Sequence, residues 1–243
     1  MLSQTNEITI EKEKMWRSMM KALFIDLDGT LTDILEREVE AIYDTANHFG
    51  SVVSKAEIKR HCLEKASYSD VIRGLGLEMT DELVDYWSSV FVKRYRLSIL
   101  RKGTKSTLNH LSQDYTLFCV TSRETVAEVV SELDFLGLEG VFEQVVTREV
   151  AAKHFGFASL SLLPFPKQRK KLYECALALA NCNSEDALVV GDMASELKPA
   201  KESGIRAVGL LTEKAKESGL REVADYLIPN MEHLRNILHE LRE

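Results

Sequence analysis

Acidic, hydroxyl and basic side chains occur where buried strands are expected to end. Asp26 and Asp28 follow a first apolar run, Thr121 follows a second, and Asp192 follows a third. Lys167 stands near the start of a predicted helix between the last two of these runs. Functional groups of a parallel sheet collect at the carboxyl ends of its strands. We therefore expect three carboxylates, a hydroxyl and an ammonium group to converge at one rim of the sheet.

This set of groups suits chemistry on a phosphate ester. A carboxylate such as Asp26 can attack phosphorus and become an acyl phosphate, while a divalent metal and a lysine neutralise the charge. Asp26 and Asp192 are hard oxygen ligands suited to magnesium. Asp28 can protonate the leaving oxygen and then activate water. Thr121 can hold phosphate oxygens, and Gly29 lets the backbone approach closely and turn sharply.

Each of these features also has an explanation that needs no function. The segment 26–30 alone is compatible with a turn, and Thr121 or Ser122 alone with a helix cap before Glu124. Lys167 opens a basic run of the kind found on solvated helix faces. Their joint occurrence in this order, each at a strand end or helix start, favours a functional site.

The elements that must position these groups alternate between strand and helix after residue 100. Short apolar runs typical of buried strands are followed by segments with apolar residues at helical spacing. This alternation predicts an α/β fold, with a Rossmann-like parallel sheet covered on both faces. The expected strands are 22–25, 116–120, 142–146, 187–190, 205–211 and an edge strand at 224–228, and the expected helices are 105–111, 124–136, 167–180, 196–203 and 231–241.

Residues 34–99 have a different texture. Apolar residues recur there at helical spacing over 36–49, 55–66 and 81–97, and only the brief run 51–53 suggests a strand. The block therefore predicts an inserted α-helical subdomain with hinges near 32–33 and 100–103. The expected organisation is an N-terminal extension over 1–20, a core domain over 21–33 and 100–243, and the helical subdomain over 34–99.

Four short motifs stand in a characteristic order. They are D-L-D-G-T-L-T-D over 26–33, a strand ending in Thr over 118–121, Lys167 with Tyr173 but without flanking prolines, and Gly191-Asp192 with Glu196. With them the sequence resembles the haloacid dehalogenase (HAD) superfamily, in its phosphoglycolate-phosphatase-like branch of magnesium-dependent phosphatases with a helical cap. The resemblance covers about residues 21–230.

The resemblance implies a role for each motif residue. Asp26 would be the nucleophile and a metal ligand. Asp28 would be the general acid/base and would offer its backbone carbonyl to the metal, and Asp192 would complete the protein ligands of Mg²⁺. Thr121 and Lys167 would hold the transferring phosphoryl group.

The resemblance says less about the residues that would recognise the substrate. Glu196 stands where Asp is commoner, and would act behind the metal ligands through water or towards Lys167. Arg123 follows the second motif where Asn or Lys is common and can reach a second anionic group, with Ser122 beside it. In the helical subdomain Arg73 is the first expected substrate contact, because neighbouring glycines let its backbone approach the cleft. Phosphoglycolate, pyrophosphate, nucleoside monophosphates and sugar phosphates all remain open.

Other functions of the superfamily are weighed against this set. Asp28 argues against haloacid dehalogenases, which lack this acid, and against transport ATPases, which place Thr there. A phosphomutase of the β-phosphoglucomutase type keeps all four motifs and differs mainly in its cap. Phosphonate hydrolysis needs a cap lysine that forms a Schiff base, and nothing marks one here. A non-catalytic phosphate-binding protein would show the loss of an essential acid or lysine.

The composition of the chain limits the classes of partner that it can bind. Lys and Arg number 31 and Asp and Glu 38, so the formal net charge of −7 makes nucleic acid a poor partner. No apolar run approaches the roughly 18 residues of a membrane span. Four cysteines without C-x-x-C spacing, and an N-terminus unlike a signal peptide, favour free thiols in the cytoplasm. We expect a monomer or homodimer that acts on a small phosphorylated metabolite, with no membrane partner.

One stretch has no assigned role. Residues 151–166 are longer and more apolar than the usual link into the lysine motif of the superfamily. They predict either a buried packing segment or an exposed patch for a partner or lid.

Overall fold

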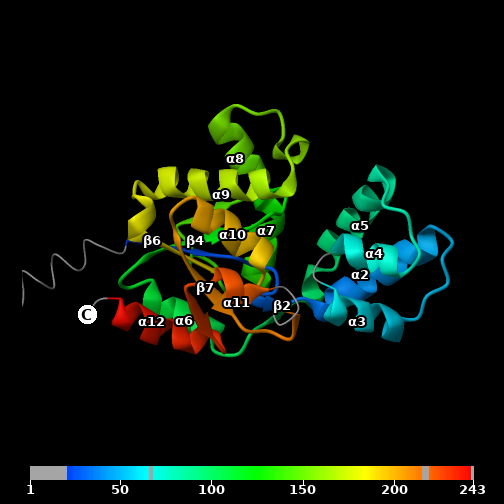
Figure 1. The fold of residues 1–243 in the computed structure, drawn as a ribbon, viewed down its shortest axis with the longest axis horizontal. Helices are drawn as coiled ribbons and strands as arrows, with labels where there is room; N and C mark the ends of the chain where they lie inside the picture. Colours follow the sequence, from blue (N-terminus) through cyan, green and yellow to red (C-terminus); the bar gives the residue numbers. More distant parts are fainter. Residues whose placement is uncertain (1–20, 66–67, 215–218, 242–243) are drawn as a thin grey trace, which may run out of the picture.

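A six-stranded sheet forms the centre of the protein. The computed structural model describes residues 21–65, 68–214 and 219–241. The strand order is β5-β4-β1-β6-β7-β8 and every pairing is parallel, which confirms the predicted α/β fold (Figure 1). The strands are β1 (Ala22–Ile25), β4 (Thr116–Val120), β5 (Gln144–Val146), β6 (Ala187–Gly191), β7 (Arg206–Leu210) and β8 (Tyr226–Ile228).

The chain reverses its direction of progress across the sheet at β1. From β1 it proceeds to β4 and β5 on one side, and it then returns to place β6, β7 and β8 on the other. In open α/β sheets such a switch point leaves a crevice at the carboxyl ends of the strands, where ligands bind. The ends of β1, β4 and β6 are therefore the place where this fold can hold a site.

Helices cover both faces of the sheet. Along β1 the side chains alternate, so that Ala22 and Phe24 belong to one apolar core, and Leu23 and Ile25 to the other. The first core is covered by α8 (Arg148–Phe155), α9 (Phe165–Ala180), α10 (Ala194–Glu202) and α11 (Leu220–Val223), and the second by α6 (Thr104–Leu111), α7 (Val126–Phe135) and α12 (Leu234–Glu240). Figure 1 shows α8 and α9 on one side of the sheet and α6 and α12 on the other.

Four helices form a separate block beside the sheet. This helical block comprises α2 (Leu35–His48), α3 (Lys55–Glu64), α4 (Tyr68–Gly74) and α5 (Asp81–Lys93), and it lies at one end of the molecule (Figure 1). It buries its own apolar cluster, which includes Val39, Ile58 and Ile72. Ser54 and Thr80 cap α3 and α5, each accepting a hydrogen bond from a backbone N–H three residues on.

A short antiparallel ribbon joins the helical block to the sheet domain. It pairs β2 (Thr32–Asp33) with β3 (Ile99–Leu100), so the chain enters and leaves the block side by side. The sequence did not predict this ribbon, because strands of two residues carry no periodicity. The helix α4 was also not predicted, because its seven residues make only about two turns and show little periodicity. The long helix expected over 81–97 ends at Lys93 and is followed by a 3₁₀ turn.

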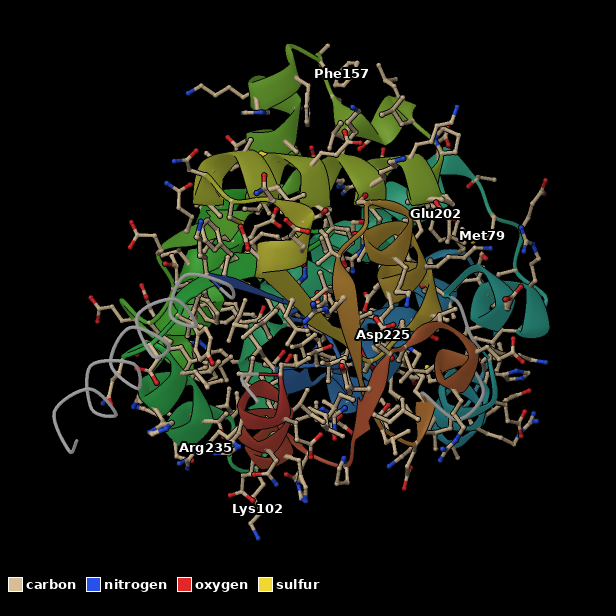
Figure 2. All side chains as sticks on the ribbon, turned by 60° about the vertical axis from the view of Figure 1, so that its left-hand side comes forward. Met79, Lys102, Phe157, Glu202, Asp225 and Arg235 are labelled. Atoms are coloured by element: carbon tan, nitrogen blue, oxygen red, sulfur yellow. The ribbon has the colours of Figure 1, made fainter. Side chains whose placement is uncertain are left out.

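The apolar stretch 151–166 is only partly buried. It continues α8, passes through a 3₁₀ turn at Leu160–Leu162 and enters α9. Ala151, Ala152 and Leu160 pack in the core, whereas Leu162 is 80% exposed. Figure 2 shows Phe157 at the outer tip beyond α8, away from the sheet.

The structure also bears on the expectations for the cysteines and for membrane-spanning segments. The four cysteines are free. Within the part of the chain that is described, no helix combines the length and the apolar character needed to span a membrane. The expected N-terminal extension over 1–20 lies outside the described residues.

The central strand should be the most sensitive part of the fold. Phe24 is fully buried and meets Phe118 edge to face, with ring centroids 5.5 Å apart. We expect Phe24→Ala to lower the free energy of unfolding by about 3–5 kcal/mol, because it opens a cavity between strand and helices. Urea denaturation measures the change. Val52→Ala is the control, since Val52 is 99% exposed and should change stability by less than about 0.5 kcal/mol.

Candidate active site

Three neighbouring strands deliver polar residues to one rim of the sheet. Asp26 follows β1, Thr121 follows β4 and Asp192 follows β6, and all three side chains are buried. The backbone continues the sheet past two of these ends, because Asp26 N–H donates to the Val190 carbonyl and Thr121 N–H to the Val146 carbonyl, each at 3.0 Å. The sheet ladder therefore fixes the positions from which these side chains project.

The cation beside Asp26 is Arg169. Its Nη2 donates to Asp26 Oδ1 at 2.9 Å and also pairs with Glu196. Arg169 is buried, and its Nε and Nη1 have no hydrogen-bond partner among the described residues. One planar guanidinium thus joins two carboxylates and keeps further N–H donors for another acceptor.

The structure does not bring Lys167, the expected phosphate-binding lysine, to this rim. Lys167 is exposed in the first turn of α9, while Arg169 two residues later is buried at the site. Successive helix residues are rotated by about 100°, so residues two apart point about 200° apart and cannot share one face. The helix also begins at Phe165, two residues earlier than predicted, because its first turn tolerates Pro166, whose missing N–H has no partner there anyway.

Asp28 lies in a second ionic system, separate from that of Asp26. Arg123 clasps it with two parallel bonds, from Nε to Oδ2 at 2.6 Å and from Nη2 to Oδ1 at 2.5 Å. The backbone N–H of Arg123 donates to Thr121 Oγ1 at 3.3 Å. Arg123 therefore contacts a carboxylate of the protein itself.

Asp192 is held close to the turn that follows β1. Thr30 Oγ1 donates to Asp192 Oδ1 at 3.1 Å, and Thr212 Oγ1 lies 3.5 Å from Oδ2. Gly29, at φ +88°, passes so near that a Cβ there would lie 2.5 Å from Asp192 Oδ2. The turn therefore needs glycine for two reasons, its left-handed backbone and this close approach.

The remaining expected contacts fall in different places. Ser122 lies beside Thr121, and its buried Oγ has no partner among the described residues. A cavity of about 310 Å³ opens beside Asp28 and Asp192, and residues of the helical block line its far side. Arg73 is not among the residues that line it; its side chain is 64% exposed and pairs with Asp70 at 3.5 Å.

Acidic side chains accumulate at the rim beyond what Arg169 balances. Oxygens of Asp26, Asp192 and Glu196 lie within 4.8 Å of one another. Burial raises the pKa of Asp26 to about 6, against the attraction of Arg169, and burial together with the charge of Asp26 raises that of Asp192 to about 7. The pKa of Glu196 is also well above its ordinary value, chiefly through burial.

This cluster fits a divalent cation. Three carboxylates against one guanidinium leave an excess of two negative charges when all are ionised. Asp26 Oδ2 is buried without a hydrogen-bond partner among the described residues. Carboxylate oxygens are the ligands that hard divalent cations prefer. Asp26 and Asp192 follow the neighbouring strands β1 and β6, so they are the two carboxylates that we expect to hold the ion. Glu196 Oε2, which also has no hydrogen-bond partner among the described residues, lies beside them.

The pKa of Asp28 is moved in the opposite direction from that of Asp26. Burial alone would raise its pKa, but the Arg123 ion pair and hydrogen bonds outweigh burial and hold the pKa below its ordinary value. Two carboxyl groups only two residues apart therefore have pKa values moved apart, that of Asp26 upwards by burial and that of Asp28 downwards by Arg123. Such divergence is typical of carboxyl groups with different chemical tasks.

Sequence reasoning missed three residues of this site. Arg169 was overlooked because Lys167 matched the expected motif, although counting around the helix could have distinguished the two. Arg37 and Glu132 join the Asp28 system through contacts between residues 95 positions apart. No local sequence signal indicates such a contact.

Comparisons with known proteins agree with this geometry. The haloacid dehalogenase-like hydrolase family matches residues 23–210. A pyrophosphatase of Bacillus velezensis, PpaX, is 25% identical over 89% of this chain and 95% of its own length. A glyceraldehyde 3-phosphate phosphatase of Methanocaldococcus jannaschii is 24% identical over 93% of this chain and 100% of its own.

A solved structure supports the fold independently. A haloacid dehalogenase-like hydrolase from Streptococcus pneumoniae superposes with a TM-score of 0.71 at 20% identity. The match covers 90% of this chain and 99% of that one. The likeness therefore extends over both the sheet domain and the helical block.

Divalent cation binding should be measurable as added thermal stability. We expect a saturating divalent cation, at about 100 times its Kd, to raise the unfolding temperature by roughly 5–10 °C. Asp192→Asn should lose most of that shift, because it removes one of the two available carboxylates. Asp85→Asn, on the exposed side of α5, should keep it in full. An equal shift in the wild type and in Asp192→Asn, measured by differential scanning fluorimetry, would place the cation elsewhere.

Proposed function

Because the chain belongs to the haloacid dehalogenase-like hydrolase family, we propose that it is a magnesium-dependent phosphatase that hydrolyses a small phosphate monoester through an aspartyl-phosphate on Asp26. The observation that carries this proposal is the buried pair of Asp26 and Arg169 beside Asp192, with Asp28 held separately by Arg123. The arrangement supplies a nucleophile, a cation site and an independent proton-transfer group within one crevice.

Each group has a distinct task in this proposal. The Asp26 carboxylate attacks phosphorus, and the ester oxygen leaves as the new P–O bond forms. Arg169 lies against Asp26 and has unused N–H donors, so it can neutralise phosphoryl oxygens as they approach. The Thr121 hydroxyl, which accepts one backbone hydrogen bond, can donate its own proton to another phosphoryl oxygen.

Asp28 moves the protons. It gives one to the leaving oxygen and takes one from the water that then attacks the acyl phosphate. The first of these steps needs the protonated form of Asp28, which its lowered pKa makes the less populated one, and the second needs the ionised form, which the lowered pKa favours. A magnesium ion held by Asp26, Asp192 and the Asp28 carbonyl would offset negative charge on the phosphoryl group.

The cavity supports a small substrate. At about 310 Å³ it has room for a compact metabolite, and it is lined by both the sheet domain and the helical block. Arg101 and Lys214 stand at its wall. Lys214 is paired with Glu38, which also lines the cavity, so Arg101 is the group that offers positive charge to an anionic leaving group. We propose that residues 34–99 act as the cap that encloses this cavity, hinged at the β2–β3 ribbon. The relatives described above are named for different small phosphates, which is consistent with a shared crevice and a variable cap.

The nucleophile is tested with a panel of small phosphate monoesters in the presence of Mg²⁺. We expect Asp26→Asn to abolish turnover while leaving the unfolding temperature close to that of the wild type, because the amide cannot form the acyl phosphate. Phosphate release is the measurement. Asp85→Asn should retain full activity. Undiminished turnover by Asp26→Asn, or by protein treated with a chelator, contradicts the mechanism.

Arg169 and Lys167 form a matched pair on one helix. We expect Arg169→Met to lower kcat by roughly 10²–10³-fold, the loss typical of removing a preorganised group that stabilises transition-state charge. Lys167→Met should leave kcat and KM unchanged, since Lys167 is exposed and points away from the carboxylates.

Arg169→Lys separates charge from geometry. It restores a cation without the planar fork, and should recover part of the activity. Steady-state kinetics on the best ester of the panel gives all three values. The assignment would have to be reversed if Lys167→Met were the more damaging change.

A further inference from the structure

Arg37 is a fully buried arginine on α2 of the helical block. Its guanidinium donates to the Phe91 carbonyl at 2.7 Å and to Ser98 Oγ at 3.1 Å, and it pairs with Glu132 at 2.6 Å. Glu132 lies on α7 of the sheet domain and is also fully buried. A buried ion pair costs several kcal/mol in desolvation, which apolar residues of similar size would not incur. Its presence at this junction therefore calls for a role beyond packing.

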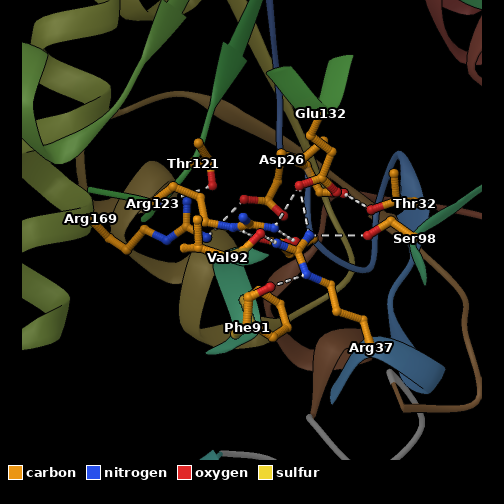
Figure 3. Close-up of polar contacts among 12 residues, drawn as sticks. Asp26, Thr32, Arg37, Phe91, Val92, Ser98, Thr121, Arg123, Glu132 and Arg169 are labelled. Atoms are coloured by element: carbon orange, nitrogen blue, oxygen red, sulfur yellow. Dashed lines mark hydrogen bonds and ion pairs between the residues drawn. The ribbon is translucent and has the colours of Figure 1, made fainter. Parts of the chain in front are cut away.

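The contacts of Arg37 continue to Asp28. Glu132 Oε2 accepts from Arg37 Nη1 at 2.6 Å and from Arg123 Nη2 at 3.2 Å. Arg123 in turn clasps Asp28 with its two bonds of 2.6 and 2.5 Å. Figure 3 shows Arg37, Glu132 and Arg123 as neighbours linked by these bonds. We call the series Arg37, Glu132, Arg123 and Asp28 the relay.

An aromatic ring braces the two arginines of the relay. The Cζ atom of Arg37 lies 4.0 Å from the ring centroid of Phe91, and that of Arg123 lies 4.8 Å from it. Phe91 belongs to α5 of the helical block. Arg123, in the loop between β4 and α7 of the sheet domain, is therefore oriented by groups from other elements, the Glu132 carboxylate and the Phe91 ring.

The relay is not needed merely to attach the helical block to the core. Lys214 Nζ binds both oxygens of Glu38, at 2.9 and 3.1 Å, and so joins α2 to the loop after β7. Glu38 is adjacent to Arg37, so α2 contacts the core at two different points. One of these contacts leads to the acid/base carboxylate, and the other lines the cavity.

We propose that Arg37 is a positioning residue, which through Glu132 holds Arg123 against Asp28 and so fixes the acid/base carboxylate in its working orientation. The proposal rests on the proposed function of Asp28. A carboxylate at a strand exit can rotate about two side-chain bonds, and a bidentate guanidinium suppresses that rotation. Arg123 has four rotatable bonds of its own, so it positions Asp28 only while Glu132 and Phe91 restrain it.

The relay can be cut without leaving a lone buried charge. Arg37→Met/Glu132→Met replaces the ion pair by apolar side chains, a change that is often neutral or stabilising. We expect the variant to fold and to lose about 10²-fold in kcat on the alkyl phosphate that the wild type hydrolyses fastest, the cost of a misplaced catalytic group. The loss on p-nitrophenyl phosphate should be much smaller, since that leaving group needs little protonation. Glu132→Gln, which preserves side-chain shape, should show the same pattern more weakly.

The decisive measurement combines the relay variant with Asp28→Asn. If Arg37 acts through Asp28, adding Arg37→Met/Glu132→Met to Asp28→Asn causes no further loss of kcat on the alkyl phosphate. Multiplying losses would overturn the proposal, as would equal losses on alkyl and p-nitrophenyl phosphates.

Arg94→Met/Asp44→Met is the matched control. It removes an ion pair that lies wholly within the helical block, and it should keep the wild-type ratio between the two esters. A loss of the same pattern in this control would assign the effect to the block as a whole and overturn the relay.

The two proposals fail in different ways. A wild-type protein that hydrolyses no ester with Mg²⁺ overturns the proposed function. A wild type that is active, with relay variants that behave like the control, overturns only the positioning role. A crystal structure of Arg37→Met/Glu132→Met decides the relay in either case: we expect the Asp28 carboxylate to have moved, and an unchanged Arg123–Asp28 pair would refute the proposal.

Discussion

The burial of carboxylates at one rim of the sheet is the constraint around which this protein is organised. Asp26, Asp192 and Glu196 converge there because the carboxyl ends of neighbouring parallel strands meet. Burial makes the charged forms of these carboxylates unfavourable, and repulsion from neighbouring carboxylates adds to the effect, as the raised pKa values of Asp26 and Asp192 show. Arg169 offsets only part of that charge. The electrostatics of the site therefore favour a bound cation.

An arginine at position 169 neutralises the buried carboxylates in a different geometry from a lysine. A lysine would bring a single ammonium group, whereas the guanidinium bridges Asp26 and Glu196 and retains further donors. Glu196, one methylene longer than aspartate, contacts this guanidinium directly. The guanidinium of α9 and the carboxylate of α10 thus form a direct ion pair behind Asp26.

Two carboxylates that are almost adjacent in sequence each pair with a different arginine. Arg169 faces Asp26, and Arg123 faces Asp28. The second system extends through Glu132 to Arg37 of the helical block, which also contributes residues to the wall of the cavity. This makes the helical block part of the catalytic apparatus in the proposed mechanism, and not only a cover over it.

The sequence by itself determined the alternating α/β core, the helical block between two core segments, and the positions of Asp26, Asp28, Thr121 and Asp192. These follow from short-range patterns: apolar runs end where polar residues begin, and parallel strands end on one side. Two features were decided only by the tertiary structure. Arg169 and not Lys167 reaches the rim, because the packing of α9 on the sheet decides which of its faces turns inward, whereas helical spacing alone only places the two residues on different faces. The Arg37–Glu132–Arg123 contacts depend on how α2 and α7 pack together, and residues 95 positions apart share no local pattern that records such packing.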